Sequence, residues 1–89
     1  MSVYQLNKIF YLLDMDEDFL ARTKKDPGGA TKDFDLTDAE RTALLNGDVG
    51  QLYKWGVHTF ILNSAARHEV FGVNRENYLK RIRAAAEGK

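Results

Sequence analysis

Apolar residues recur at intervals of three and four positions along most of this chain, and no stretch alternates apolar and polar residues as a half-buried strand requires. The clearest stripe begins the sequence and consists of Val3, Leu6, Ile9, Phe10 and Leu13. This spacing places the side chains on one face of a helix over roughly residues 3–13. The pattern predicts an all-α fold of about five helices. The length of 89 residues predicts one domain over residues 1–89.

Helix-boundary residues divide the first half of the chain. Asp14 and Asp16 interrupt the first stripe, and aspartate is a residue type that caps the start of a helix, here a short second one. The sequence Pro27-Gly28-Gly29 follows. Because proline lacks an amide donor and glycine is costly to order, this sequence predicts the end of any helix and a mobile loop over residues 26–35.

Two further boundaries have the spacing of a capping box. Thr37 and Glu40 stand three positions apart, so that each side chain can reach the free backbone amide of the other residue. They predict a helix over about residues 38–46. Asp48 and Gln51 repeat the same spacing and predict the start of the next helix.

That next helix extends over residues 49–67 by its apolar pattern, but it contains Gly56. A glycine inside a helix costs about 1 kcal/mol relative to alanine, so the sequence predicts a helix that is kinked or broken near Gly56. Gly72 is expected to end the segment that follows this helix, and Asn74 can cap the start of the last helix. The core stripe of that last helix is expected to consist of Tyr78, Leu79, Ile82 and Ala85 or Ala86.

Composition excludes several classes of protein. Thirteen basic and thirteen acidic side chains give a formal charge of zero, so the chain lacks the excess of positive charge typical of proteins that bind nucleic acid. It has no cysteine, which excludes disulfides and cysteine-ligated zinc or iron–sulfur sites. No run approaches the roughly 18 apolar residues of a membrane span, and the N-terminal residues do not have the pattern of a signal peptide. We therefore expect a soluble cytoplasmic protein.

Metal sites are not favoured by the spacing of the candidate ligands. His58 and His68 are ten positions apart, which on one continuous helix corresponds to about 1000° of rotation and leaves them about 80° out of alignment. Neither Glu69 nor Asp48 completes a recognised ligand pattern with them. The acidic residues within 14–18 lack the glycine and the distal glutamate of a calcium loop. The sequence predicts histidines that cap a helix or lie at an interface, and a solvated acidic start of the second helix.

The apolar stretch 55–62 leaves two interpretations open. Trp55 and Phe60 could stack on a ligand, although aromatic residues at helical spacing more commonly pack in a core. Val57, Phe60 and Leu62 could likewise form the chain's own core or bind a partner.

Several segments together resemble one known family. They are VYQLNKIFYLL from Val3, DEDFLARTKKDPGGATKDFDLTDAERTALLNGDVGQLYKWGVHTFIL from Asp16, and NYLKRI ending at Ile82. In this order they resemble the LigA family, the small alpha subunit of LigAB-type extradiol ring-cleaving dioxygenases. Each segment alone is a weak signal, and the succession of FLARTKKD, LTDAER and GDVGQLYKWGVH is the specific part.

The resemblance implies an all-helical subunit that caps the active site of a larger beta subunit. The beta subunit would hold the catalytic Fe(II) and open a catecholic ring, with the aromatic substrate at the shared interface, and this chain would bind no cofactor of its own. In the alpha subunit of the family's representative enzyme, a longer insert before the final helix approaches the substrate, whereas here residues 65–73 span that gap, as in a compact member of the family. The candidates for lid or partner contacts are Trp55, His58, Phe60, Arg67, His68 and Phe71.

The alternative is a free-standing helical interaction module or a homodimer without a catalytic role. In that case the stretch 55–62 would be the chain's own core or the dimer interface. Co-purification with an iron-dependent partner distinguishes the two hypotheses.

Overall fold

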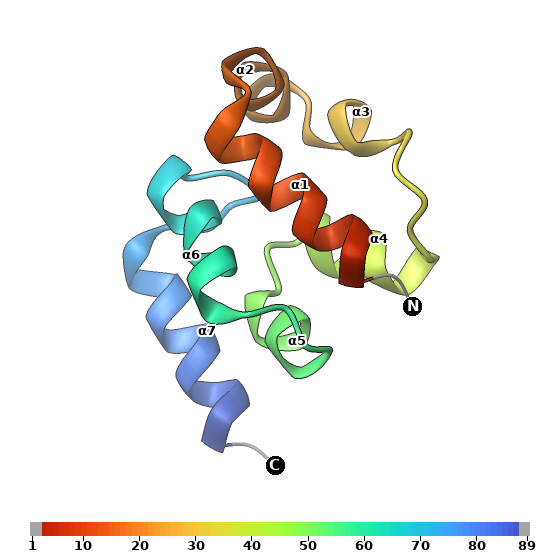
Figure 1. Cartoon of the computed structure of the whole chain (residues 1–89). Helices are drawn as coiled ribbons and strands as arrows, with labels where there is room; N and C mark the ends of the chain where they lie inside the picture. The colour runs from red at the N-terminus through yellow and green to blue at the C-terminus, as the bar shows by residue number, and fades with distance from the viewer. Residues whose placement is uncertain (1–2, 88–89) are drawn as a thin grey trace.

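The computed structural model describes residues 3–87, and within that range it contains seven α-helices and no strand. They are α1 (Val3–Met15), α2 (Glu17–Lys25), α3 (Pro27–Thr31), α4 (Asp38–Leu45), α5 (Val49–Lys54), α6 (Thr59–His68) and α7 (Arg75–Glu87). In Figure 1, α1 crosses the front of the molecule, α2 and α3 lie at one of its ends, and α6 and α7 lie along one side. The prediction of an all-α fold is confirmed, although the number of helices is seven rather than about five.

One additional helix arises at Gly56. Its φ of +112° lies in a region that residues with a side chain rarely adopt, so the helix predicted over 49–67 is broken here and not merely kinked. Trp55 ends α5, and His58 caps the start of α6. As a result α5 packs mainly on α7, whereas α6 packs mainly on α1.

The other additional helix lies in the segment 26–35, where the prediction of a loop was wrong in part. Pro27 is the first residue of α3, a position where its missing amide hydrogen costs nothing. The carboxylate of Asp26 accepts a hydrogen bond from the amide of Gly29 at 3.1 Å. Beyond α3, the guanidinium of Arg41 donates to the carbonyl oxygens of Thr31, at 3.1 Å, and Phe34, at 2.9 Å. These bonds hold the segment against α4.

The predicted helix starts agree with the structure where it describes them. Thr37 and Glu40 form a reciprocal capping box at the start of α4. Asp16 and Asp48 cap α2 and α5 by accepting from backbone amides three residues later. Asn74 accepts from the amide of residue 77 at the start of α7. Asp14, in contrast, does not interrupt the first helix, because α1 continues to Met15.

The core is formed by one face of α1 together with residues from the later helices. Leu6, Ile9, Phe10 and Leu13 are buried, as the first stripe predicts. Phe10 packs edge-on against Phe71, with ring centroids 6.3 Å apart. One residue of the predicted last stripe differs, because Leu79 is 53% exposed. Among the described residues, no helix is both long and apolar enough to cross a membrane.

Candidate functional site

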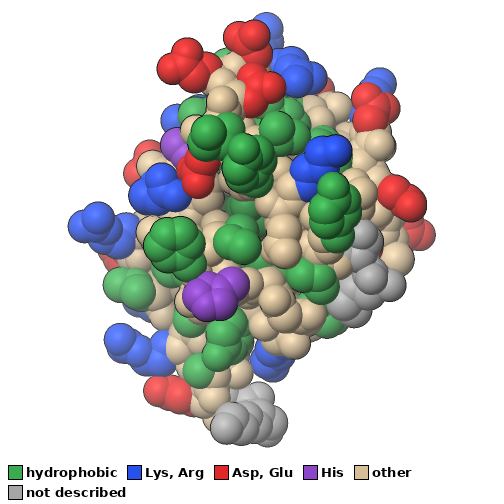
Figure 2. Space-filling view, viewed as in Figure 1, with side chains coloured by type: hydrophobic (Ala, Val, Ile, Leu, Met, Phe, Trp, Pro, Cys, Tyr) green, Lys and Arg blue, Asp and Glu red, His purple; other side chains and the backbone are tan. Residues whose placement is uncertain are grey.

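The outer face of α1 carries large apolar side chains that the core does not use. Tyr4, Tyr11 and Met15 are each at least 60% exposed. Across from them on α6, Phe60 is 82% exposed, the highest value among the exposed large hydrophobic residues of the described chain. Figure 2 shows green apolar side chains gathered over this side of the molecule. Exposed apolar side chains that gather on one face often mark an interaction site.

A groove of about 330 Å³ lies between the two helices. We call it the α1–α6 groove, and its lining residues are Asn7, Phe10, Tyr11, Asp14, Phe60 and Ile61. A second hollow continues along α1 and is lined by Tyr4, Asn7, Lys8 and Tyr11. Because Asn7 and Tyr11 line both, the two hollows form one continuous surface.

The local structure of α6 explains why Phe60 points outward. His58 Nδ1 accepts a hydrogen bond from the amide of Phe60 at 3.0 Å and so fixes the start of the helix. In the first turn that follows, Leu62 is fully buried, whereas Phe60 faces away from the core. The hydroxyl of Tyr78 donates to the carbonyl oxygen of Thr59 at 2.8 Å, which holds the same turn against α7. The orientation of Phe60 is therefore set by the helix and its cap.

A polar cluster joins α1 to α6 at one end of the groove. Asp14 accepts hydrogen bonds from Ser64 Oγ at 2.8 Å and from Arg67 Nη2 at 3.1 Å. His68 Nε2 lies 2.8 Å from the same carboxylate. Burial alone raises the pKa of Asp14, but the bonds from His68, Ser64 and Arg67 outweigh that effect and hold the pKa below its ordinary value. The carboxylate stays ionised at neutral pH and ties the two helices together.

Asn7 introduces an unpaired polar atom into this face. Its Oδ1 atom is hidden from solvent and has no hydrogen-bond partner within residues 3–87. A buried acceptor without a donor costs about 1–3 kcal/mol, and native structures contain few of them. Among the described residues, the side-chain acceptor of Asn7 is therefore left unsatisfied.

The structure brings three of the six predicted site residues to this face. Phe60 lines the groove, and Arg67 and His68 contact Asp14 at its end. His58 lies exposed at the start of α6, next to Phe60.

The other two predicted site residues lie elsewhere. Trp55 is half-buried and lines a separate hollow with residues of α4. Phe71 is buried in the core against Phe10, so its ring is not offered to a lid or a partner. Val57 and Leu62, which could have been partner anchors, are likewise buried in the chain's own core.

The sequence prediction missed the contribution of α1. Tyr4, Lys8, Tyr11 and Met15 form a second stripe at helical spacing, on the face opposite to the buried one. Two tyrosines and a methionine on the outer face of a helix are the signal that could have indicated this surface. The role of Asp14 had no local signal, because its partners on α6 lie 50 or more residues away in the sequence.

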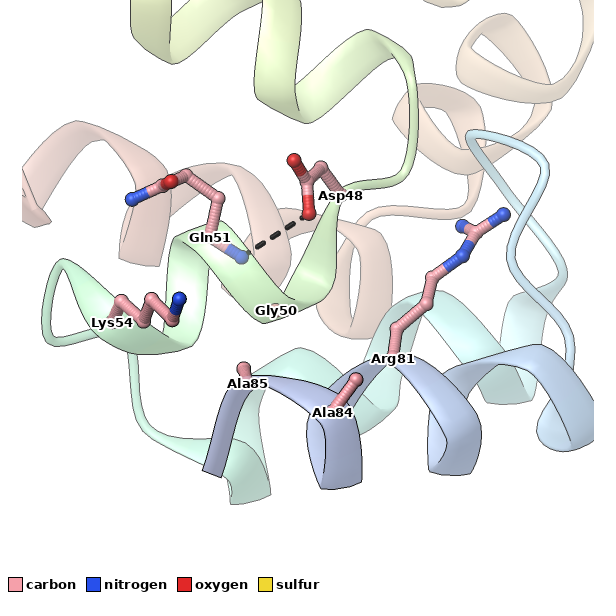
Figure 3. Close-up of a pocket in the computed structure, with 7 residues that line it drawn as sticks. All are labelled: Asp48, Gly50, Gln51, Lys54, Arg81, Ala84 and Ala85. Carbon is pink, nitrogen blue, oxygen red and sulfur yellow. Dashed lines mark hydrogen bonds between the residues drawn. The ribbon is translucent and has the colours of Figure 1, made fainter. Parts of the chain in front are cut away.

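A further hollow lies between α5 and α7 and is shown in Figure 3. Gly50 faces Ala84 and Ala85 across it, and a Cβ atom at position 50 would lie 2.9 Å from the carbonyl oxygen of Arg81. The glycine thus permits the close approach of the two helices. Arg81 Nη1 donates to the carbonyl oxygen of Gly47 at 2.6 Å, a contact that holds the α4–α5 turn against α7. These contacts serve helix packing.

The described residues contain no group of three or more His, Asp or Glu side chains that could hold a metal ion. His58 and His68 lie at opposite ends of α6. The donor set of residues 3–87 therefore does not fit a non-heme iron centre of two histidines and a carboxylate.

These features define a small all-α protein with an exposed apolar face on α1 and α6. Residues 6–79 match the family described as the LigA subunit of the aromatic-ring-opening dioxygenase LigAB. This match covers most of the chain, and the chain belongs to the LigA family. Searches of curated proteins and of solved structures returned no match.

Proposed function

We propose that this chain is the small alpha subunit of an extradiol dioxygenase and caps the active site of a larger, LigB-type catalytic subunit. Membership of the LigA family supports a role as a subunit of an aromatic-ring-opening dioxygenase. The single observation that carries the capping role is the ring of Phe60, which is 82% exposed at the edge of an apolar groove. Exposure of this ring to water does not stabilise an isolated domain. The centre of a protein–protein interface, in contrast, is rich in aromatic anchors of this kind.

In this proposal the catalytic Fe(II) belongs to the partner, where it supplies the chemistry by which dioxygen opens a catecholic ring. The contribution of this chain is to cover the site and exclude water, which strengthens electrostatic interactions inside it. His58 is the side chain of this chain best placed to donate to a substrate, because its Nδ1 is engaged by the cap while the ring remains exposed. His68 is instead engaged with Asp14.

The proposal is tested by co-expression with a LigB-type catalytic subunit. We expect the two chains to co-elute in size-exclusion chromatography, and we expect ring cleavage of a catechol to be faster with this chain than without it. Iron analysis should find the metal in the catalytic subunit and none in the isolated small chain.

The alternative of a free-standing module or a homodimer predicts a different outcome. Sedimentation of the isolated chain would then show a stable dimer or an unbound monomer, and the catalytic subunit would neither bind it nor respond to it. That result would contradict the proposed subunit role.

A further inference from the structure

We propose that the α1–α6 groove receives one large apolar side chain from the catalytic subunit, and that Lys or Arg residues flank this side chain and lie over the junction of α1 and α2. The inference rests on the proposed function and adds the docking face and the chemistry of the segment that occupies it.

The apolar part of the inference follows from the walls of the groove. Tyr11 and Phe60 border it from the two helices, and Phe10 and Ile61 contribute to its lining from the core side. The two bordering rings are 60% and 82% exposed, so a side chain placed between them would remove both from water. An anchor that fills a pocket between aromatic walls is the usual centre of an interface.

The charge of the flanking residues follows from the acidic end of the same face. Met15 is followed by Asp16, Glu17 and Asp18, which together with Asp14 line an open hollow. Asp14 is already paired with donors from α6, and the carboxylate of Asp16 caps α2. Glu17 and Asp18 are exposed and form no salt bridge with another described residue.

Acidic residues in a first helical turn also stabilise the helix through its dipole, and this alone can account for their presence. Their position is the additional observation, because Asp14 lines both the apolar groove and the acidic hollow and so joins the two surfaces. A partner that covers the groove must cover or approach these carboxylates as well. Positive side chains on the partner would offset the desolvation of these carboxylates and would accelerate association.

Asn7 adds a third requirement for the partner. Asn7 lines both hollows of this face, and its unpaired Oδ1 atom is hidden from solvent just beneath them. A donor from the docked segment, such as a backbone amide or an indole N–H, would satisfy the amide after a small rotation of the side chain. The groove therefore favours an apolar side chain with a hydrogen-bond donor beside it.

The experiment measures the affinity of the intact chain for the LigB-type catalytic subunit with which it co-purifies, by isothermal titration calorimetry. We expect Phe60→Ala to weaken binding about 30-fold or more, as loss of a central aromatic anchor does. The control is Leu79→Ala on α7, which removes an apolar side chain that is 53% exposed and lies outside the groove. Far-UV circular dichroism should show that both variants remain folded, since neither side chain is buried.

Charge reversal tests the basic flank. Glu17→Lys should weaken binding about fivefold at low salt and less at high salt, because the interaction is between exposed charges. Glu76→Lys on α7 is the control and should have no comparable effect. Asn7→Leu should stabilise the free chain and yet weaken the complex, since it removes both the unpaired atom and the acceptor.

Each outcome is decisive for one part of the hypothesis. Equal affinities for Phe60→Ala and Leu79→Ala would overturn the docking face, and equal effects of the two charge reversals would overturn the basic flank. If Asn7→Leu bound as tightly as the unaltered chain, the donor would be excluded. Absence of any complex with the unaltered chain would instead contradict the proposed function itself.

Discussion

Nε2 of His68 lies 2.8 Å from Oδ1 of Asp14, although the two residues are 54 positions apart in the sequence. The contact joins the last turn of α6 to the last turn of α1, the two helices that form the walls of the α1–α6 groove. Arg67 and Ser64 reinforce it through the same carboxylate. The separation of the walls at this end therefore depends on one ionised side chain.

Substitution of Asp14 tests this dependence. We expect Asp14→Asn to lower the free energy of unfolding by about 0.5–1 kcal/mol, because it removes an ion pair that is partly exposed while keeping one oxygen for Ser64. Urea denaturation followed by circular dichroism measures the change. Asp33→Asn, in the exposed segment after α3, serves as the control and should leave stability unchanged. Equal midpoints for the two variants would show that the cluster does not clamp the helices.

The pH dependence of stability should report the same carboxylate. The pKa of Asp14 is lowered in the folded chain from an ordinary value of 3.8. The contribution of this carboxylate to stability is therefore complete well above that value and is lost as the pH falls through the lower folded pKa. The difference in unfolding free energy between the unaltered chain and Asp14→Asn should shrink as the pH falls below about 4. A difference that stayed the same through the strongly acidic range would contradict the assignment.

Two neighbouring positions on α6 should respond differently to truncation in the isolated chain. Leu62 is fully buried, so Leu62→Ala should cost about 2–5 kcal/mol of stability through lost contacts and a cavity. Phe60 is 82% exposed, so Phe60→Ala should change stability by no more than about 0.5 kcal/mol. Chemical denaturation of both variants measures the contrast. A large loss for Phe60→Ala would place that ring in the core and remove the basis of the docking face.

Gly50 tests the packing of α5 on α7. Alanine is favoured over glycine in a helix by about 1 kcal/mol, but its Cβ atom would lie 2.9 Å from the carbonyl oxygen of Arg81. Overpacking of this kind costs about 1–3 kcal/mol, so we expect Gly50→Ala to be destabilising on balance. Gly28→Ala in α3 is the matched control, since its Cβ atom would meet nothing closer than 4.0 Å. A melting temperature that rises for both variants would show that α7 can move away from α5.

His58 tests whether this chain contributes chemistry to the proposed complex. His58→Asn keeps a side chain that can cap α6 but removes the imidazole. If the ring donates to the substrate, this variant should lower kcat or raise KM while the iron content of the catalytic subunit stays the same. Lys80→Ala on the exposed side of α7 is the control. Rates and pH profiles identical to those of the unaltered chain would limit the role of this subunit to shape and the exclusion of water.

The sequence predicts those parts of the fold that depend on neighbouring residues. The capping box of Thr37 and Glu40 and the buried stripe of α1 are both local, and both are confirmed. The preceding helix ends at Lys25, directly before Asp26 and Pro27, as the sequence predicts. A new helix also begins at Pro27, because Asp26 supplies the cap that makes this position favourable, and the loop predicted to follow is therefore helical in part.

The candidate site was harder to predict because its parts come from different helices. Phe60 was identified as a candidate from its aromatic character, but no local pattern shows that Val57 and Leu62 turn inward while Phe60 turns outward. That orientation depends on the break at Gly56, which resets the direction of the helix. The bonds to Asp14 depend on the packing of α1 on α6, which the sequence spacing alone does not give.

The break at Gly56 has a consequence for how this protein can change by mutation. It divides the packing between one pair of helices, α1 and α6, and another pair, α5 and α7. Stability effects of substitutions without shared contacts usually add. Changes at exposed positions of α1 and α6, away from the bond between Tyr78 and Thr59 that joins α6 to α7, should therefore leave the α5–α7 pair undisturbed. Substitutions on the exposed face that surrounds the α1–α6 groove should therefore be tolerated without loss of the packing of α5 on α7.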